Sequence, residues 1–263
     1  MNQIPVTIVQ EHKLPIVSKI IDRGTHSFVG ILRDHPTCVL KRPRQNEDTL
    51  KSEKRALALL GQHPYIVQLQ RTSESGLCFE YHPFRSLRHY YAESGPPSLD
   101  QRYRWCHQAV SGFAYIHSKN LIHHDISARN VLLSSDLTIK ICDFGSATQL
   151  GEEIHGLAEF RYSFGRVSRE WKATFMYDLF CMGALFYEII VGKPPFDDLN
   201  RAEVVERFKQ QTLPSLDAIE HTYATIIANC WNDKYSSFQE LEADLPSQVQ
   251  EYHNGLSEST ILS

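Results

Sequence analysis

The chain has 263 residues, of which 42% are hydrophobic and 22% charged, and its formal net charge is −4. These proportions are ordinary for globular proteins and argue against a disordered, fibrous or membrane chain. Because the acidic balance lacks the excess of lysine and arginine typical of nucleic-acid binders, we expect no nucleic-acid partner.

The N-terminal segment MNQIPVTIVQEHKLP has no basic stretch followed by an apolar one, and no apolar run is long enough to span a bilayer. We therefore expect a protein that stays inside the cell, in the cytoplasm or nucleus, without a membrane partner. The six cysteines stand singly in apolar stretches, without CxxC pairs or zinc-ligand spacing. This predicts reduced core residues, and a disulfide framework in an oxidising compartment is the alternative.

The first eighty residues favour a small sheet with one helix. Three β-branched runs, VSKIID, FVGILR and TCVLK, are separated by RGTHS and DHPT, which are turn compositions, so they predict an antiparallel meander. A leucine face then predicts a helix with Asn46 as N-cap and Gly61 just past its end. Two further strands, IVQLQRT and GLCFE, follow.

After EYHPFRS the pattern becomes mainly helical. The loop SGPPSLDQ leads into an amphipathic helix with Ser98 and Gln101 at capping-box spacing. The segment FMYDLFCMGALFYEII is apolar nearly all round, which predicts a buried central helix ended by Gly192 and Pro194. We find no internal repeat, and residues after about Glu251 lie outside the expected core.

The strongest chemical signal is LIHHDISARNVLL followed by IKICDFG. The strands VLL and TIKI flank a polar SSD turn, so Asp125, Asn130 and Asp143 would lie at the ends of one hairpin. Phosphoryl transfer needs positioning and charge neutralisation more than covalent chemistry, and carboxylate and amide oxygens suit both tasks. The alternative is a polar turn in which Asp143 starts an ordinary Asp-x-Gly turn.

With CVLK, LCFEYHPFRSL and the run MYDLFCMGALFYE, VGKPPF and ANCW, these segments resemble the eukaryotic protein kinase family over nearly the whole chain. The resemblance implies an α+β, bilobal protein-kinase-like fold in a single domain spanning residues 1–263. The expected parts are an N-lobe of five antiparallel strands plus one helix (residues 1–80) and a hinge (81–84). A mainly helical C-lobe (85–250) and a tail (251–263) would follow.

The resemblance also implies roles for the polar residues. Asp125 would orient the substrate hydroxyl and accept its proton, while Asn130 and Asp143 would bind Mg²⁺. Lys41 would bridge the α- and β-phosphates of ATP, and Glu53, which falls on the apolar face of the predicted helix, would pair with Lys41. The alternative is a surface lysine and a surface glutamate.

The adenine ring would lie between the lobes. By resemblance, the backbone of Glu80 and His82 would meet its edge, and Phe79 would stand at the back of the pocket. The apolar side chains enclosing the ring would be Ile31, Val39 and Leu132, with Val39 on the same strand face as Lys41. A plain connector between lobes is the local alternative.

Three segments depart from the family pattern. The phosphate-covering loop GTHSFVGI keeps Gly24, but His26 and Val29 replace the other glycines, which predicts weak nucleotide binding or another loop shape. His124 replaces the arginine that receives an activation-segment phosphate, so we expect activity independent of that phosphorylation. The APE motif is altered to Ser168, Arg169 and Glu170.

The substrate class rests on a few positions. Ser127 and Arg129 blur the distinction between serine/threonine and tyrosine kinases, whereas Ser163 fits the serine/threonine pattern. Arg161, with Arg166 and Arg169, suggests a dock for acidic or phosphorylated residues, and a solvated basic face is the alternative. By resemblance, Asp178 would bond the backbone of the catalytic loop.

The combined prediction is an ATP- and Mg²⁺-dependent protein kinase that phosphorylates serine or threonine in a protein substrate. The altered loops motivate the alternative of a pseudokinase acting as a nucleotide-binding or scaffold module. A third hypothesis is phosphorylation of a small metabolite. The sequence leaves the oligomeric state and the regulator open.

Overall fold

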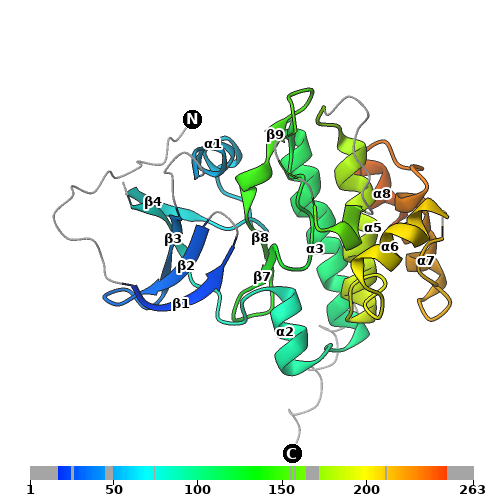
Figure 1. Cartoon of the computed structure of the whole chain (residues 1–263), viewed down its shortest axis with the longest axis horizontal. Helices are drawn as coiled ribbons and strands as arrows, with labels where there is room; N and C mark the ends of the chain where they lie inside the picture. Colours follow the sequence, from blue (N-terminus) through cyan, green and yellow to red (C-terminus); the bar gives the residue numbers. More distant parts are fainter. Residues whose placement is uncertain are drawn as a thin grey trace, which may run out of the picture.

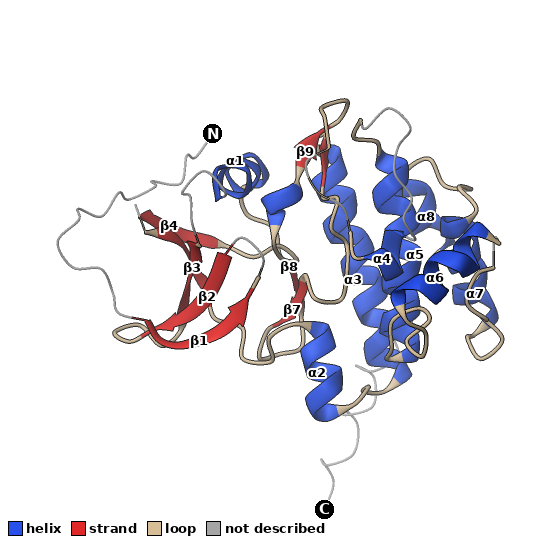
Figure 2. Cartoon of the chain, viewed as in Figure 1, coloured by secondary structure: helices blue, strands red, loops and turns tan. Residues whose placement is uncertain are grey.

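The computed structural model describes residues 17–24, 27–44, 50–73, 75–154, 156, 158–163, 172–210 and 212–247. The chain forms two lobes, a small one built on a sheet and a larger one built on helices (Figure 1). Figure 2 shows the strands of the small lobe gathered on one side and nearly all helices on the other. The predicted α+β, bilobal fold is therefore confirmed.

The small lobe is a five-stranded antiparallel sheet with strand order β1-β2-β3-β5-β4. Its strands are β1 (Val17–Arg23), β2 (Ser27–Leu32), β3 (Cys38–Pro43), β4 (Leu69–Ser73) and β5 (Gly76–Glu80). The three predicted strands from VSKIID to TCVLK form the expected meander, and β5 inserts between β3 and β4. This order puts β3 in the middle of the sheet, where both of its edges are paired.

Helix α1 (Lys51–Leu60) buries Ala56, Leu57 and Leu60 and contacts the 3₁₀ turn η2 (Phe144–Ser146). It ends where predicted, at Gly61, whose φ of 63° lies in the left-handed region that favours glycine. The helix begins at Lys51 with Leu50 as N-cap. Asn46, the predicted N-cap, lies outside the described residues.

The large lobe is mainly helical. Its helices are α2 (Leu87–Ser94), α3 (Leu99–Ser118), α4 (Phe160–Ser163), α5 (Phe175–Val191), α6 (Arg201–Lys209), α7 (His221–Trp231) and α8 (Phe238–Asp244). Ser98 caps α3 by accepting a hydrogen bond from the Gln101 amide at 3.4 Å, as its spacing predicts. Helix α5 is buried along nearly its whole length and ends at Gly192, which has a φ of 84°.

Short strand pairs place the polar motifs against this helical framework. The pair β7 (Val131–Leu133) and β8 (Ile139–Ile141) is the predicted hairpin, with Asn130 just before it and Asp143 just after it. A second pair joins β6 (Leu121–Ile122) to β9 (Thr148–Gln149), and the 3₁₀ turn η2 (Phe144–Ser146) lies between β8 and β9. Both ends of the segment between β6 and β7, residues 123–130, are thus held by strand pairing, and we call it the catalytic segment because it carries the candidate residues Asp125 and Asn130.

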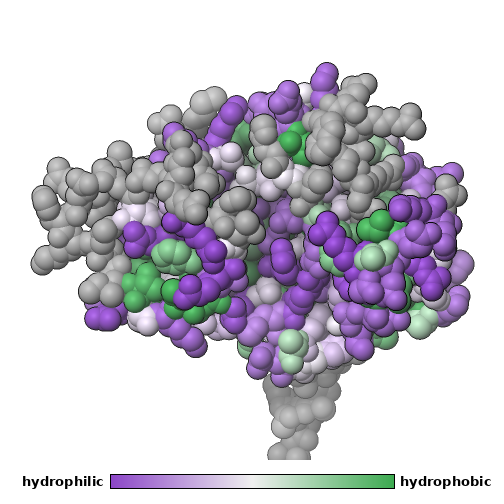
Figure 3. All heavy atoms as spheres, in the orientation of Figure 1, coloured by the Kyte–Doolittle hydropathy of each residue, from purple (hydrophilic) through white to green (hydrophobic). Residues whose placement is uncertain are grey.

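One hydrophobic core runs through both lobes. It includes Val39 and Leu57 of the small lobe together with Ile141 and Phe144 of the large one. The face shown in Figure 3 is mostly hydrophilic, with hydrophobic residues gathered on the left, where β1 and β2 lie. The two lobes are therefore joined by continuous packing of apolar side chains.

The cysteines and helices agree with the composition. All six cysteines are free, four of them buried and two, Cys38 and Cys142, partly buried, so the structure pairs none of them in a disulfide. Within the described ranges, no helix has the length and apolar character needed to cross a membrane.

The first residue of β5, Gly76, provides a stability test. Gly76 has a φ of 148°, and a Cβ there would lie 2.1 Å from the Lys41 carbonyl oxygen, which belongs to the neighbouring strand. We expect Gly76→Ala to lower the free energy of unfolding by more than about 2 kcal/mol in urea denaturation. Gly95→Ala is the matched control, because Gly95 has a φ of 72° but nothing within 4 Å of its Cβ position. It should cost only about 1 kcal/mol, and equal losses for the two variants would contradict the steric argument.

Candidate active site

Strand β3 presents Lys41 on the face that looks toward α1 and the large lobe. Val29 of β2 lies directly opposite Lys41, and Ile31 lies opposite Val39. Directly paired residues of an antiparallel sheet share a face, so these four side chains line one surface. The strand alternation predicted this for Val39 and Lys41, and the register adds the two residues of β2.

Two carboxylates from different elements meet the Lys41 ammonium. Its Nζ lies 2.6 Å from Glu53 Oε2 on α1 and 2.8 Å from Asp143 Oδ1 at the end of β8. Lys41 and Glu53 are both buried, with 8% and 1% exposure, while the Asp143 side chain is 46% exposed. The predicted pairing of Lys41 with Glu53 is present, and the alternative of two surface residues is wrong.

These contacts determine the charge states. Burial alone would lower the pKa of Lys41, but the Glu53 and Asp143 carboxylates outweigh it and hold that pKa above its ordinary value. Burial would likewise raise the pKa of Asp143, yet the Lys41 ammonium keeps it below the usual range. Lys41 is therefore a cation and Asp143 an anion at neutral pH.

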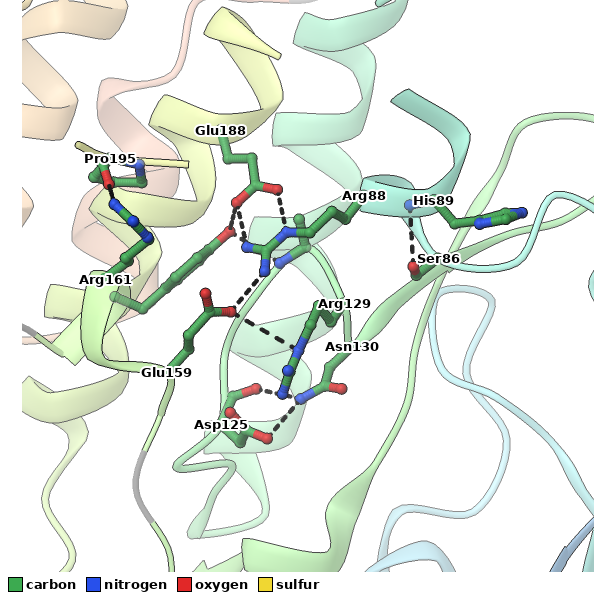
Figure 4. Close-up of polar contacts among 12 residues, drawn as sticks. Ser86, Arg88, His89, Asp125, Arg129, Asn130, Glu159, Arg161, Glu188 and Pro195 are labelled. Atoms are coloured by element: carbon green, nitrogen blue, oxygen red, sulfur yellow. Dashed lines mark hydrogen bonds and ion pairs between the residues drawn. The ribbon is translucent and has the colours of Figure 1, made fainter. Parts of the chain in front are cut away.

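The catalytic segment between β6 and β7 brings Asp125 and Asn130 together (Figure 4). Asn130 Nδ2 donates to both Asp125 Oδ2 and the Asp125 carbonyl oxygen, each at 2.8 Å. The amide group turns its NH₂ to Asp125 and its oxygen to the opposite side, as Figure 4 shows. Burial raises the pKa of Asp125, although His123 and the Asn130 amide lower it in part.

The Asp178 carboxylate of α5 binds the backbone of this segment. Its Oδ2 accepts a hydrogen bond from the His123 amide at 2.7 Å, and its Oδ1 accepts one from the His124 amide at 3.0 Å. His117 Nε2 of α3 lies 3.0 Å from the same carboxylate. Burial would raise the pKa of Asp178, but the His117 bond and the nearby imidazoles keep it low. The predicted role of Asp178, bonding the backbone of the loop, matches these contacts.

His124 occupies a fully buried position. Its backbone has a φ of 63°, and its Nε2 lies 2.7 Å from Thr148 Oγ1 of β9. The side chain therefore joins the catalytic segment to β9 through a direct bond. Positive φ is uncommon outside glycine, so the Asp178 and Thr148 contacts stabilise a conformation that the residue alone disfavours.

The apolar side chains expected around adenine lie where the two lobes meet. Phe79 is buried in β5 opposite Val39, and Leu132 of β7 forms a bridge with Ser86 just after the hinge. Ile31 and Leu132 are partly buried and pack on the main core. Ile31 and Val39 of β2 and β3 form the small-lobe side of the candidate adenine site, which we call the roof. Leu132 of β7 forms the large-lobe side, which we call the floor.

The phosphate-covering loop is described only in part. Gly24 follows β1, where a Cβ would meet the Ser27 carbonyl oxygen at an ordinary 3.6 Å. Val29 lies inside β2 and pairs with Lys41, so it has strand conformation without positive φ. His26 lies outside the described residues. Val29 therefore shares the sheet face of Lys41, which was not predicted from the sequence. Only the pairing register of β2 with β3 reveals this position.

The comparisons agree with this geometry. The family model for the protein kinase domain matches residues 36–244, which is most of the chain. The chain belongs to the protein kinase family. The matched region contains β3, the catalytic segment and α5, and therefore Lys41, Asp125 and Asp178. Strands β1 and β2 lie before it.

Similar kinases are named for different acceptor residues, some for serine or threonine and others for tyrosine. The chain is 26% identical to the probable serine/threonine-protein kinase PknB of Lactococcus lactis, over 80% of this chain and 37% of that protein. It is 25% identical to the mouse cytoplasmic tyrosine-protein kinase BMX, over 91% of this chain and 41% of that protein. It is 32% identical to the yeast serine/threonine-protein kinase PKH2, over 56% of this chain and 15% of that protein. The chain spans less than half the length of these relatives.

A partly buried ionic network was not predicted from the sequence. Arg88 of α2 lies 2.7 Å from Glu188 of α5 and 2.7 Å from Glu159, which precedes α4 (Figure 4). The Tyr162 hydroxyl donates to Glu188 at 2.5 Å and accepts from the Ala128 amide at 3.0 Å. Because these residues are far apart in the sequence and follow no local motif, only the fold reveals that they pair.

The predicted basic docking cluster is described only at its first member. The Arg161 guanidinium donates to the carbonyl oxygens of Pro195 and Phe196, so it is occupied within the fold. These bonds orient the Arg161 side chain, and the docking role of the basic cluster stays a prediction. Arg166, Arg169, Ser168 and Glu170 lie outside the described residues.

The Asp178 contacts give a second test. Asp178→Asn places an NH₂ group against one of the two backbone amides, so we expect the free energy of unfolding at pH 7 to fall by about 2–4 kcal/mol. Because the pKa of Asp178 is lowered on folding, its contribution is present at neutral pH and is lost as the pH falls below about 4. The wild-type and variant curves, followed by denaturant unfolding, should converge in acid.

The exposed Asp217, which accepts a hydrogen bond from Ser215, provides the control. Asp217→Asn should change the free energy of unfolding by no more than about 0.5 kcal/mol. A similar loss in both variants would show that the Asp178 carboxylate has no special role in holding the loop.

Proposed function

We propose that this chain is an ATP- and Mg²⁺-dependent protein kinase that phosphorylates serine or threonine residues of a protein substrate. The single observation that carries the proposal is the meeting of Lys41, Glu53 and Asp143 from three separate elements at 2.6 and 2.8 Å. Because desolvation offsets much of the attraction, a buried cation held by two carboxylates adds little net stability, which favours a functional role for the cluster. We further infer that residues 1–263 form a single kinase domain with the lobe boundaries expected above.

The residues fit the nucleotide and the metal. Asp143 supplies a half-exposed carboxylate and Asn130 an amide oxygen turned away from Asp125, and both are the hard oxygen donors that Mg²⁺ takes. Lys41 supplies the positive charge for phosphate oxygens. When bound, Mg²⁺ would neutralise the charge that develops on the transferred phosphate.

Asp125 has the properties of a base for the substrate hydroxyl. Its raised pKa brings it closer to the range in which a carboxylate accepts and releases a proton efficiently. The Asn130 amide fixes the orientation of its carboxylate, and Asp178 fixes the backbone that carries it. Glu80 and His82 would bind the adenine edge through their backbone, with Ile31, Val39, Val29 and Leu132 enclosing the ring and Gly24 near the phosphates.

Substitution of the charged residues tests the roles. We expect Lys41→Met, Asp125→Asn and Asp143→Asn each to lower the rate of radiolabelled phosphate transfer to a peptide library at least about 100-fold. Libraries with serine, threonine or tyrosine as the only acceptor measure the hydroxyl preference, and dominant labelling of tyrosine would contradict the serine/threonine assignment. Equal labelling by the wild type and all three variants would refute the assigned roles.

A pseudokinase is the second candidate, favoured by the loss of two loop glycines in GTHSFVGI. ATP titration separates the two functions, because a ligand that binds only the folded state raises its melting temperature. A kinase should show a shift with ATP and Mg²⁺ that Asp143→Asn reduces. A nucleotide-dependent shift without any phosphate transfer would identify a nucleotide-binding module instead.

The buried His124 supports activity without activation-segment phosphorylation. Its bond to Thr148 Oγ1 already joins the catalytic segment to β9, a connection that an arginine and a phosphate make in many regulated kinases. We expect treatment with a broad phosphatase, verified by mass spectrometry, to leave the initial rate of peptide phosphorylation within about twofold of the untreated protein. A loss of activity that re-phosphorylation restores would overturn this expectation.

A further inference from the structure

Arg85 has an unusual backbone at the exit of the hinge. Its φ is 57°, a region that residues other than glycine seldom adopt. Its amide donates to the His82 carbonyl at 3.0 Å, and its carbonyl accepts from the Leu133 amide at 2.8 Å. The backbone of Arg85 is thereby fastened to both the hinge and the β7 strand of the large lobe.

The Arg85 side chain crosses to the other lobe. Its Nη2 donates to the carbonyl oxygen of Ile21, which lies in β1 of the small lobe. Its Nη1 lies 3.4 Å from both ring nitrogens of His89 on α2, so the guanidinium packs against the ring rather than aligning with one lone pair. The His89 ring points away from the Arg88 network, as Figure 4 shows. The Arg85 side chain therefore connects β1 of the small lobe with α2 of the large lobe.

The connection lies along the outer edge of the candidate nucleotide cleft. On the floor, Ser86 is bridged to Leu132, and Leu133 is bonded to Arg85 itself. On the roof, β1 pairs with β2 so that Ile20 lies opposite Gly30 and Lys19 opposite Ile31. Arg85 thus joins a strand adjoining the roof to the floor, and the link between β5 and α2 runs between the sheet and the large lobe (Figure 1).

The cleft is consequently tied at two places. The inner tie is the ion pair of Lys41 with Asp143, which belongs to the phosphate side. The outer tie is the Arg85 bond to Ile21, on the side where the hinge meets α2. An outward motion of β1 must break the outer tie, whereas the inner one involves β3 and is independent of it.

We propose that Arg85 is a positioning residue that controls nucleotide exchange by holding β1 down over the cleft, an inference that rests on the proposed binding of ATP. Nucleotide then enters and leaves when the bond to Ile21 is open. The positive φ supports this role, because a backbone conformation unfavourable for arginine is retained at the point from which its side chain reaches β1. Arg85 need not touch the nucleotide, since it acts through β1.

The test is stopped-flow binding of a fluorescent N-methylanthraniloyl ATP with Mg²⁺ to the full chain. Arg85→Ala should raise both the association and the dissociation rate constants about fivefold, as expected for loss of one charge-assisted hydrogen bond at a partly exposed position. The dissociation constant should change less than about twofold, because the tie opens for entry and exit alike. A purely structural role would weaken affinity or stability without raising the association rate.

Two further variants separate the tie from the backbone. Arg85→Gly relaxes the positive φ, so it should melt no lower than Arg85→Ala while exchanging nucleotide as fast. Arg85→Lys keeps the charge without the planar fork and should give intermediate rates. The control is Arg104→Ala, an exposed residue of α3 that contacts Gln101, which should exchange nucleotide at the wild-type rate.

Hydrogen exchange of the nucleotide-free chain provides the second readout. Peptides covering β1 should exchange faster in Arg85→Ala than in the wild type and in Arg104→Ala, while peptides of α3 should be unchanged. Unaltered exchange in β1, or unaltered nucleotide rate constants in a chain that binds ATP, overturns the proposal. A wild-type chain that binds no nucleotide overturns the proposed function instead, and exchange in β1 then decides whether Arg85 restrains the strand.

Discussion

The structure depends on the ammonium of Lys41, buried at the centre of the sheet and neutralised by Glu53 and Asp143. A buried lysine without partners would lose its charge or destabilise the fold, so α1 and the end of β8 are constrained to stay near β3. The ion pairs therefore fix the separation of the two lobes as well as the charges of the cleft. The apolar core beneath, shared by Val39 and Phe144, makes this arrangement stable.

The catalytic segment is held by the same principle, with carboxylates binding groups from distant elements. Asp178 bonds two backbone amides, and Glu188 and Glu159 share Arg88. These contacts connect α2, α5 and the segment before α4 to the loop that carries Asp125. These carboxylates thus hold the loop in position, and the proposed chemistry is left to Lys41, Asp125, Asn130 and Asp143.

Motif spacing was sufficient to predict the fold and most of the candidate site. Alternation placed Val39 with Lys41, and the apolar face of α1 pointed to a buried Glu53. Local pattern could not identify partners that are distant in sequence. The Arg88 network, the sheet face of Val29 and the contacts of Arg161 depend on helix packing and strand register, so no sequence window contains them.

The sequence by itself determined the element order, the hairpin that carries Asn130 and Asp143, and the family, because periodicity and short motifs are local properties of the chain. Only the tertiary structure decided which charges meet, since burial and distance arise when separate elements pack. It placed Arg85 across the lobes, put Val29 on the sheet face of Lys41 and enclosed His124 beside Thr148. Each of these depends on the relative position of two segments, which residue order does not encode locally.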